Sequence, residues 1–560
     1  MNYTRTFPFL RWFPLRKENV KADLIAGATV GFLLVPQSMA YAQLAGLPPH
    51  YGLYTAFVPV IIASLFGWCS QLHTGPVAMV SLLTAAVLEE SHLAVTGSPE
   101  YVALAIMLSL LAGVILLVLG LLKLAAVVNF FSHPVIVGFT NAGALIIAMS
   151  QINLFLKLPL GRGDYFIKDF YEMMMQTPDT HLPTLIFGAL AISFLLVTKK
   201  IRPKWPGALI VVFLSVAISW LLSFDARFGG SVVGEIPKGL PALKVPSASL
   251  NDIVKLLPGA FMVAMIGFLE VLAICKVIAA KTKERLDMNQ ELVGQGLSGI
   301  LGSFSQAYPV SGSFSRSALN LYAGAMTGMS SIFAAILVMI VLLFLTPFLY
   351  YLPRAVLGAI IVAAVIGLID VKAFFRIWRT SRFDGVAAVV TFLAALAMAP
   401  RITEGILIGA VLAIIFHLYQ IMKPDFNILG KDSDGTLKDA ERYDLKTGGK
   451  ILAVGFRGRL VFANASHFEE SILRALSAKP DTKAILLVAS GINSIDATGE
   501  ETLRHIVEEF RKNGIEVFVS EATDRVLDVL KRTGLYNLIG EKYFSASAIQ
   551  TFDELSRRYS

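Results

Sequence analysis

The stretch AYPVSGSFSRSALN occupies residues 307–320 and lies between two apolar segments of the chain. Pro309 removes a backbone donor and Gly312 permits unusual backbone angles, so a helix is expected to begin at one of the two serines that flank Gly312. The first N–H groups of that helix have no intrahelical acceptors, and its dipole is positive at that end. Arg316 lies within the first turn. These groups and the serine hydroxyls predict a pocket that suits an anion.

Helical spacing divides this stretch into two faces. One face carries Ser313, Arg316, Ser317 and Asn320, and the other carries Phe314, Ala318 and Leu321. Two interpretations stay open for these polar residues. Serines in membrane helices often bond only to backbone carbonyls, and an arginine can snorkel or form a structural ion pair. A charge at membrane depth is costly, however, and usually marks a functional site.

A second stretch, HTGPVAMVSLLT at residues 73–84, has the same character. Gly75 and Pro76 are expected to start a helix on which Val77, Ser81 and Thr84 align. Ser81 and Thr84 carry hydroxyl groups. Short, interrupted segments at matching positions of two halves are typical of inverted repeats with a binding site at the bilayer midplane. Two helix N-termini that face each other, with no acid from either, favour an anion and repel a cation.

The composition is that of a polytopic membrane protein. Of the 560 residues, 55% are hydrophobic and only 16% are charged, and several apolar runs reach the length of about 20 residues that crosses a bilayer. The sequence predicts 14 spans in two sets of seven, which makes the second set inverted relative to the first. The expected spans cover residues 22–45, 52–67, 74–90, 101–122, 132–156, 184–199 and 206–223, then 254–280, 287–304, 312–328, 330–350, 353–369, 385–399 and 402–421.

The charges set the expected topology. With the N-terminus inside, the basic stretches at 199–204, 276–285 and 372–382 fall on the cytoplasmic side, as the positive-inside rule requires. The net charge of +8 is therefore assigned to topology and not to nucleic acid. Residues 1–21 are expected to form a basic cytoplasmic arm without a signal peptide. Cys69 and Cys275 lie in apolar runs and imply no disulfide framework.

The character of the chain changes after about residue 422. Residues 423–448 are polar and are expected to form a linker. From residue 449 to 560, four strand candidates alternate with four helix candidates, which predicts a soluble α/β domain. The strand candidates are KILAVGF, RLVFAN, AILLVAS and IEVFVS. With 14 spans before it, this domain is expected in the cytoplasm.

Three further polar residues lie within the expected spans. Glu270 lies mid-span, where desolvation favours a neutral carboxyl group and makes it a proton-carrier candidate; the alternative is a fixed ion pair with Lys276 or Arg316. Gln37 follows Pro36, which is expected to kink the first span, and Tyr41 lies four residues further on the same face. Gln37 either lines the cavity or only bonds backbone groups that the kink releases.

Other motifs give no separate function. GQGLSG at 294–299 matches a dinucleotide fingerprint, but it lies in an apolar span and follows no strand, so helix packing explains it better. The sequence carries no P-loop, no H-E-x-x-H and no Cys/His metal spacing. No metal, cofactor or enzyme activity is therefore expected, and an ATP-driven pump is disfavoured.

Several of these motifs resemble those of the SulP sulfate permease family. They are VPQSMAYAQLAGLPPHYGLY, TGPVAMVSLLT, IGFLEVLAICKVIAAK and PVSGSFSRSALN, while LVFANASHFEE and INSIDATGEETL resemble the STAS domain that this family carries. The resemblance implies 7+7 inverted spans divided into core and gate domains, a C-terminal STAS domain, and an elevator-type, usually dimeric secondary transporter. The repeats would cover about 22–223 and 254–421 of a transport domain at 22–422.

The resemblance also assigns residues. The family's anion site maps onto Gln37, Tyr41, Val77, Ala78, Phe314, Ser315 and Arg316, and its acidic position in the eighth span maps onto Glu270. Helical spacing favours Ser313 and Ser317 beside Arg316, whereas the family motif favours Ser315. In related STAS proteins the loop that matches Asp496-Ala497-Thr498-Gly499 is phosphorylated; Ala497 departs from that pattern, and Thr498 is either a regulatory site or a helix cap.

The function expected from the sequence is secondary transport of a small anion, with sulfate and proton symport preferred over sodium coupling. Bicarbonate or dicarboxylate transport, or anion exchange, is the alternative within the same family. A nucleobase/proton symporter, a membrane-anchored signalling scaffold and a channel-like conductance are further alternatives. The expected partners are the anion, the proton, the lipid bilayer, a second copy of the chain and an unidentified cytoplasmic partner of the STAS domain, in a bacterial inner or plasma membrane.

Overall fold

The computed structural model describes residues 6–130, 132–159, 165–201 and 205–559. Part of the expected basic arm (residues 1–5) and part of the basic stretch at 199–204 (residues 202–204) lie outside these ranges. The chain divides into two compact units, Met1–Ala413 and Ile414–Ser560, and the division falls within helix α21.

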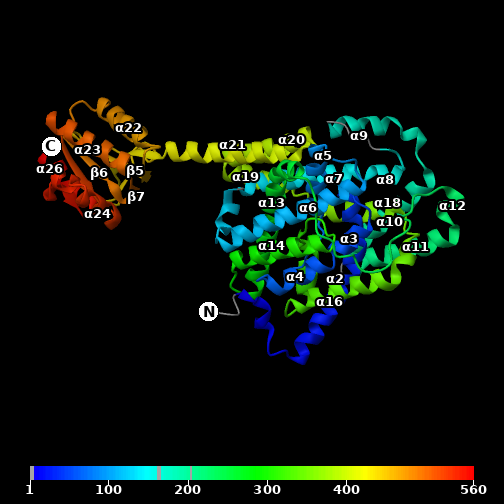
Figure 1. The fold of residues 1–560 in the computed structure, drawn as a ribbon. Helices are drawn as coiled ribbons and strands as arrows, with labels where there is room; N and C mark the ends of the chain where they lie inside the picture. Colours follow the sequence, from blue (N-terminus) through cyan, green and yellow to red (C-terminus); the bar gives the residue numbers. More distant parts are fainter. Residues whose placement is uncertain (1–5, 131, 160–164, 202–204, 560) are drawn as a thin grey trace. The chain divides into compact units, whose positions relative to one another are not determined.

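The first unit consists mainly of helices, as Figure 1 shows. The helices of its first half are α2 (Lys17–Leu44), α3 (His50–Thr55), α4 (Val58–Phe66), α5 (Ala78–Ser91), α6 (Pro99–Leu121), α7 (His133–Ser150), α8 (Ile152–Leu156), α9 (Phe166–Met175), α10 (Leu182–Ile201), α11 (Gly207–Leu222) and α12 (Phe224–Phe228). Those of its second half are α13 (Leu250–Thr282), α14 (Met288–Phe304), α15 (Phe314–Tyr322), α16 (Met329–Ile340), α17 (Thr346–Leu349), α18 (Arg354–Val365), α19 (Val371–Thr380), α20 (Arg382–Met398) and α21 (Ile402–Met422).

Each of the 14 expected spans coincides with a helix or with two consecutive helices of this series. Within the described residues, eight helical segments are long and apolar enough to cross a bilayer on their own. The third and tenth spans are short, as expected: α5 has 14 residues and α15 has nine. Neither could cross about 30 Å of hydrocarbon alone, since a helix rises 1.5 Å per residue.

The two halves of the unit interlock. Helices α6 and α14 pack along each other, as do α2 and α16, so each pair joins one helix of the first half to one of the second. A second group, in which α7 packs on α20 and α10 on α18, is assembled in the same way. Two short strands, β1 (Thr74–Gly75) and β2 (Ser311–Gly312), complete the connection between the halves.

Glycines allow α6 and α14 to approach closely. A Cβ atom on Gly296 would lie 2.5 Å from the Leu117 nitrogen, and one on Gly113 would lie 2.7 Å from the Ile300 nitrogen. Such contacts are with backbone atoms, which cannot move aside without shifting a helix. The G-x-G-x-x-G match therefore serves helix packing, as the sequence analysis expects.

The second unit is an α/β domain built on a seven-stranded sheet. Its path runs β4-β3-β5-β6-β8-β9, with β7 pairing to β5, and β5, β6 and β8 are parallel. The strands are β3 (Asp425–Lys431), β4 (Leu437–Asp439), β5 (Ile451–Leu460), β6 (Ala484–Val488), β7 (Ile492–Ile495), β8 (Glu516–Ser520) and β9 (Phe544–Ser545). The helices are α22 (Ala465–Ser477), α23 (Ala497–Lys512), α24 (Asp524–Arg532), α25 (Leu535–Ile539) and α26 (Ala548–Arg558).

The stretch expected to be a linker differs from that expectation. Residues 425–431 form β3, which pairs antiparallel with β5, and β4 extends the same edge. The candidate RLVFAN is no separate strand, because β5 continues to Leu460 and a turn follows. Polar residues in β3 concealed it, since an edge strand needs few apolar side chains when backbone pairing holds it in place.

Apolar side chains on both faces of the sheet form the core of this unit. Alternate residues of β5 point to opposite faces: Leu452, Val454 and Phe456 meet α22, α23, α24 and α25, whereas Ile451 and Ala453 meet α26. This is the layered arrangement that the alternating pattern predicts, with helices covering a mainly parallel sheet.

We expect Gly296→Val to destabilise the first unit by about 1–3 kcal/mol, because the added side chain overpacks a backbone contact. Thermal unfolding of the purified protein in detergent should show a lowered midpoint. Leu301→Ala is the matched control, because Leu301 lies on the same helix and is 40% exposed. Equal midpoints for the two variants would contradict a tight α6–α14 contact.

Candidate functional site

The starts of the two short helices meet at the strand pair β1–β2. Thr74 pairs with Gly312 and Gly75 with Ser311, in antiparallel register. Two further bonds extend the pairing: Ser313 N–H donates to the His73 carbonyl at 3.0 Å, and His73 N–H donates to Ser317 Oγ at 2.9 Å. Helix α5 begins three residues after β1 and α15 begins two residues after β2. The first-turn N–H groups of both helices therefore lie close together and add two positive helix ends.

Gly75 is required at this junction. Its φ is +153°, and a Cβ atom placed there would lie 3.3 Å from Nη2 of Arg316. Side chains are rarely tolerated in such a conformation, so glycine lets the β1 backbone pass beside the guanidinium.

Arg316 is completely buried, and its guanidinium hydrogen-bonds three neutral acceptors. Nε donates to Nδ1 of His73 at 3.2 Å, Nη1 to Oε1 of Gln37 at 3.3 Å, and Nη2 to the Pro76 carbonyl at 2.8 Å. No carboxylate of the described residues forms an ion pair with it. The snorkelling alternative is thereby excluded, since the side chain is held between the two short helices.

Helix α2 supplies the third side of the site. Gln37 is buried and accepts from Arg316, so its amide does more than bond backbone groups released by Pro36. Tyr41, one turn further along α2, is also buried, with 5% of its surface exposed. Gln37 and Tyr41 are four residues apart on α2, and their role in a common cavity stays a prediction.

Glu270 lies in α13, next to strand β2. Ser311 Oγ donates to the carbonyl of Gly267, one turn before Glu270, at 2.7 Å. Oε2 of Glu270 is buried and has no hydrogen-bond partner among the described residues. Among the described residues, Glu270 forms no ion pair with Lys276 or Arg316. The fixed ion pair that was the alternative to a proton-carrier role is therefore absent.

The serines of α15 divide by exposure. Ser313 caps the helix by accepting from Arg316 N–H at 3.4 Å, and Ser317 is fully buried and holds His73 N–H. Phe314 and Ser315 are exposed, and the Ser315 hydroxyl lies 3.3 Å from that of Ser313. Ser315 thus presents an exposed hydroxyl next to the buried Ser313, whereas Ser317 has a structural bond.

The remaining predicted residues have varied surroundings. Val77 precedes the first residue of α5, Ala78, and both are 6% exposed. Ser81 Oγ lies 3.2 Å from the Tyr308 hydroxyl, so it faces the loop before β2. Thr84 bonds only the carbonyl of Val80, which is the ordinary structural role of a threonine in a membrane helix.

Three residues of this region were missed by the sequence analysis. His73 contacts Arg316 directly, and Gln295 on α14 donates both to Thr74 Oγ1 and to Oε1 of Glu291, each at 2.9 Å. Glu291 in turn accepts from the N–H groups of residues 68 and 69, at 2.7 and 3.0 Å. The one sequence signal that could have pointed to these residues was the presence of two polar residues, Glu291 and Gln295, four positions apart in an apolar span.

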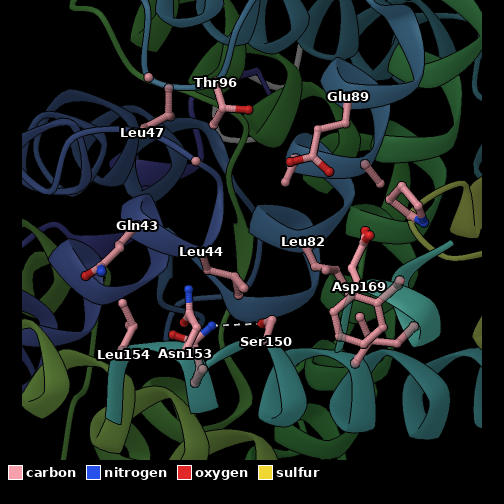
Figure 2. Close-up of a pocket in the computed structure, with 18 of the residues that line it drawn as sticks. Gln43, Leu44, Leu47, Leu82, Glu89, Thr96, Ser150, Asn153, Leu154 and Asp169 are labelled. Atoms are coloured by element: carbon pink, nitrogen blue, oxygen red, sulfur yellow. Dashed lines mark hydrogen bonds between the residues drawn. The ribbon is translucent and has the colours of Figure 1, made fainter. Parts of the chain in front are cut away.

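A separate cavity of about 460 Å³ lies at the C-terminal ends of α2 and α5. Figure 2 shows Glu89 and Asp169 among the residues that line this cavity, together with Gln43 and Asn153. None of the predicted site residues lines it. Among the charged residues that line the cavity, two acids outnumber one basic residue, Arg354. The junction where α5 and α15 begin, the half-helix junction, is therefore the better candidate for an anion.

Thr498 lies in the second unit at the start of α23, and its side chain is exposed. The cap of this helix is Asp496, whose Oδ1 accepts from Gly499 N–H and whose Oδ2 accepts from Phe462 N–H, both at 2.9 Å. Asp496 therefore performs the capping alone, which leaves the Thr498 hydroxyl accessible.

Comparison with known proteins explains both units. Residues 20–391 match the Sulfate permease family and residues 442–555 match the STAS domain. The chain belongs to the sulfate permease family. It is accordingly a membrane transport protein and not an enzyme, as predicted, and its 14 spans form the inverted repeats of this fold.

Relatives span almost the whole chain. Sulfate transporter 4.1, chloroplastic, of Arabidopsis thaliana is 34% identical over 96% of this chain and 81% of its own length. High affinity sulfate transporter 1 of Stylosanthes hamata is 31% identical over 98% and 86%. These relatives are plant proteins, so they give no support to the expected bacterial origin.

A solved structure shares the fold. Murine Slc26a9, described as an anion transporter in the inward-facing state, superposes with a TM-score of 0.90 at 24% identity and covers 99% of this chain and 94% of its own. The transmembrane domain of the cyanobacterial bicarbonate transporter BicA gives a TM-score of 0.60 at 22% identity, over 71% and 98% of the two chains.

We expect Arg316→Lys to lower the stability of this member of the sulfate permease family, although the charge is kept. A lysine ammonium cannot reach three acceptors on separate segments in the planar arrangement of a guanidinium. Thermal unfolding should show the loss, whereas Arg401→Lys should stay within about 0.5 kcal/mol, because Arg401 is 41% exposed in a surface ion pair. An unchanged midpoint in Arg316→Lys would contradict the bonding described here.

In the STAS domain, Asp496→Ala should cost about 1 kcal/mol through loss of the helix cap. Thr498→Ala should change stability by less than about 0.5 kcal/mol, because the exposed hydroxyl caps nothing. Hydrogen exchange of the first turn of α23 in the full-length protein separates the two variants. Equal protection in both would mean that Asp496 does not hold this helix end.

Proposed function

We propose that the protein is a secondary active transporter of a small anion, with sulfate as the preferred substrate and protons as the coupling ion. The observation that carries this proposal is the buried guanidinium of Arg316, held between two helix N-termini by neutral acceptors alone. Two of the similar proteins are sulfate transporters and a third is an anion transporter, which supports the same substrate class.

The charge balance of the junction favours an anion. Neutral acceptors satisfy the geometry of the guanidinium N–H groups but leave its unit charge uncompensated. Of the five N–H bonds of a guanidinium, three are used, and the helix ends add further donors. An anion beside Ser313, Ser315 and the first N–H groups of α5 and α15 would supply the missing negative charge.

Glu270 gives this site a means of coupling to protons. Its carboxyl group lies on α13 next to β2, with one buried oxygen that has no partner in the described residues. In the ionised form it would oppose an incoming anion, and protonation removes that repulsion. Anion and proton would then bind together, which is symport.

The remaining expectations from the family likeness stay part of the proposal. The group around α2, α5, α13, α14 and α15 would move as the core against the group around α7, α10, α18 and α20, in an elevator-type cycle. The N-terminal arm and the STAS domain would be cytoplasmic, the protein would form homodimers, and Thr498 would be the regulatory position. The domain bounds of 22–422 and 449–560 remain predictions, whereas β3 and β4 occupy part of the expected linker at 423–448.

Bicarbonate is the alternative substrate, because the same fold occurs in a protein described as a bicarbonate transporter. A neutral nucleobase is disfavoured: it would call for acidic acceptors at the site, whereas α15 presents Arg316. Uptake of labelled sulfate, bicarbonate, chloride and dicarboxylates into proteoliposomes, under imposed pH or sodium gradients, tests the proposal. Absence of uptake for every anion would overturn it in favour of a scaffold role, and currents that exceed coupled flux would indicate a channel.

Glu270→Gln is expected to abolish pH-driven accumulation. A gradient of one pH unit supplies about tenfold accumulation per coupled proton, and a glutamine cannot carry that proton. Uptake time courses with and without the gradient measure the difference. Glu172→Gln is the control, since Glu172 is 57% exposed and forms only a surface pair with Lys168. Uphill uptake retained by Glu270→Gln would refute the coupling role.

A further inference from the structure

His73 is the one titratable side chain that bonds Arg316 among the described residues. It is fully buried between the loop before β1 and helix α15. Its backbone is fixed from both sides, because its N–H donates to Ser317 Oγ and its carbonyl accepts from Ser313 N–H. The ring therefore has a defined position, and its two nitrogens have different surroundings.

The hydrogen bond to Arg316 determines where the ring carries its proton. A guanidinium has donors only, so Nδ1 of His73 must be unprotonated to accept from Nε at 3.2 Å. The neutral ring then carries its proton on Nε2. Nε2 is buried and has no partner among the described residues, which means that the ring is held through Nδ1 alone.

We propose that His73 is a positioning residue of the anion site and a second proton-binding group linked to anion occupancy. Neutral His73 orients the guanidinium through Nδ1. Protonation at Nδ1 breaks that bond and places a second positive charge beside Arg316, which only a bound anion can balance. This inference rests on the proposed anion transport and deepens it, because a dianion such as sulfate would be favoured over a monoanion.

Titratable groups lie on each of the elements that build the site around His73, but among the described residues only Arg316 bonds its ring. These groups are Arg316 on α15, Tyr41 on α2, Glu270 on α13, Glu291 on α14 and Tyr308 before β2. Glu291 is tied to backbone N–H groups and reaches this region only through Gln295 and Thr74. Glu270 is the other candidate proton carrier, so a test of His73 must remove it.

The coupling between anion binding and protonation of His73 acts in both directions. If an anion stabilises the protonated ring, then lowering the pH must tighten anion binding by the same factor. A His73 variant that keeps an acceptor but cannot be protonated should retain the orientation of Arg316 and lose this pH dependence. Asparagine fits that description, because its side-chain oxygen can take the place of Nδ1, whereas leucine offers neither property.

The experiment measures sulfate affinity of the full-length protein in detergent by calorimetry between pH 5.5 and 8, within the Glu270→Gln background. We expect affinity there to rise as the pH falls. Adding His73→Asn should remove that rise with a smaller loss of affinity than His73→Leu. His73→Leu should weaken binding by at least about tenfold, as for a lost hydrogen bond to a charged group. Chloride, titrated in parallel, should show a weaker pH response than sulfate.

Other outcomes contradict the inference in recognisable ways. If the Glu270→Gln protein and its His73→Asn derivative share one pH profile, His73 takes up no linked proton. If His73→Leu binds sulfate as tightly as His73→Asn, then His73 does not position Arg316. His92→Asn, at the end of α5, is the control for loss of a histidine, and unfolding midpoints identify variants that misfold. Absence of sulfate and chloride binding in the unmodified protein would instead refute the proposed function on which this inference rests.

Discussion

The pairing of β1 with β2 is the constraint on which the rest of the structure depends. Two residues from each half of the first unit form it, and the paired residues Thr74 and Gly312 lie 238 positions apart along the chain. Neither α5 nor α15 is long enough to span a bilayer, so each must end at depth, where free backbone groups are costly. Joining the two ends satisfies part of that backbone and leaves the remaining N–H groups directed at one place.

Arg316 strengthens this junction and also limits what can bind there. Its bond to the Pro76 carbonyl links α15 to the start of α5, and its bond to Gln37 adds α2. Burying a charge among neutral acceptors is unfavourable unless a counter-charge is present for part of the cycle. The sign of the charge, more than the shape of the junction, therefore separates an anion site from a site for a neutral or cationic solute.

The sequence revealed those features that are local along the chain. Apolar runs gave all 14 spans, and the Pro/Gly breaks gave the two short helices, because both signals need only neighbouring residues. The face shared by Arg316 and Ser317 followed from helical spacing. His73 was missed because its role depends on Arg316, 243 residues away. Strand β3 was missed because an edge strand pairs through its backbone and needs no marked apolar pattern.

The buried carboxylates near the junction show why the charge of Arg316 stays available. Asp23 on α2 accepts from the N–H groups of Met326 and Thr327 at 2.7 and 3.0 Å, and from the Thr327 hydroxyl at 2.6 Å. Glu291 likewise accepts from two backbone N–H groups at the loop before β1. Backbone donors satisfy the oxygens of a buried carboxyl group without needing a cation. Each acid thus fixes a loop that flanks a short helix, and neither is drawn to the guanidinium, so the positive charge at the half-helix junction is left for a ligand.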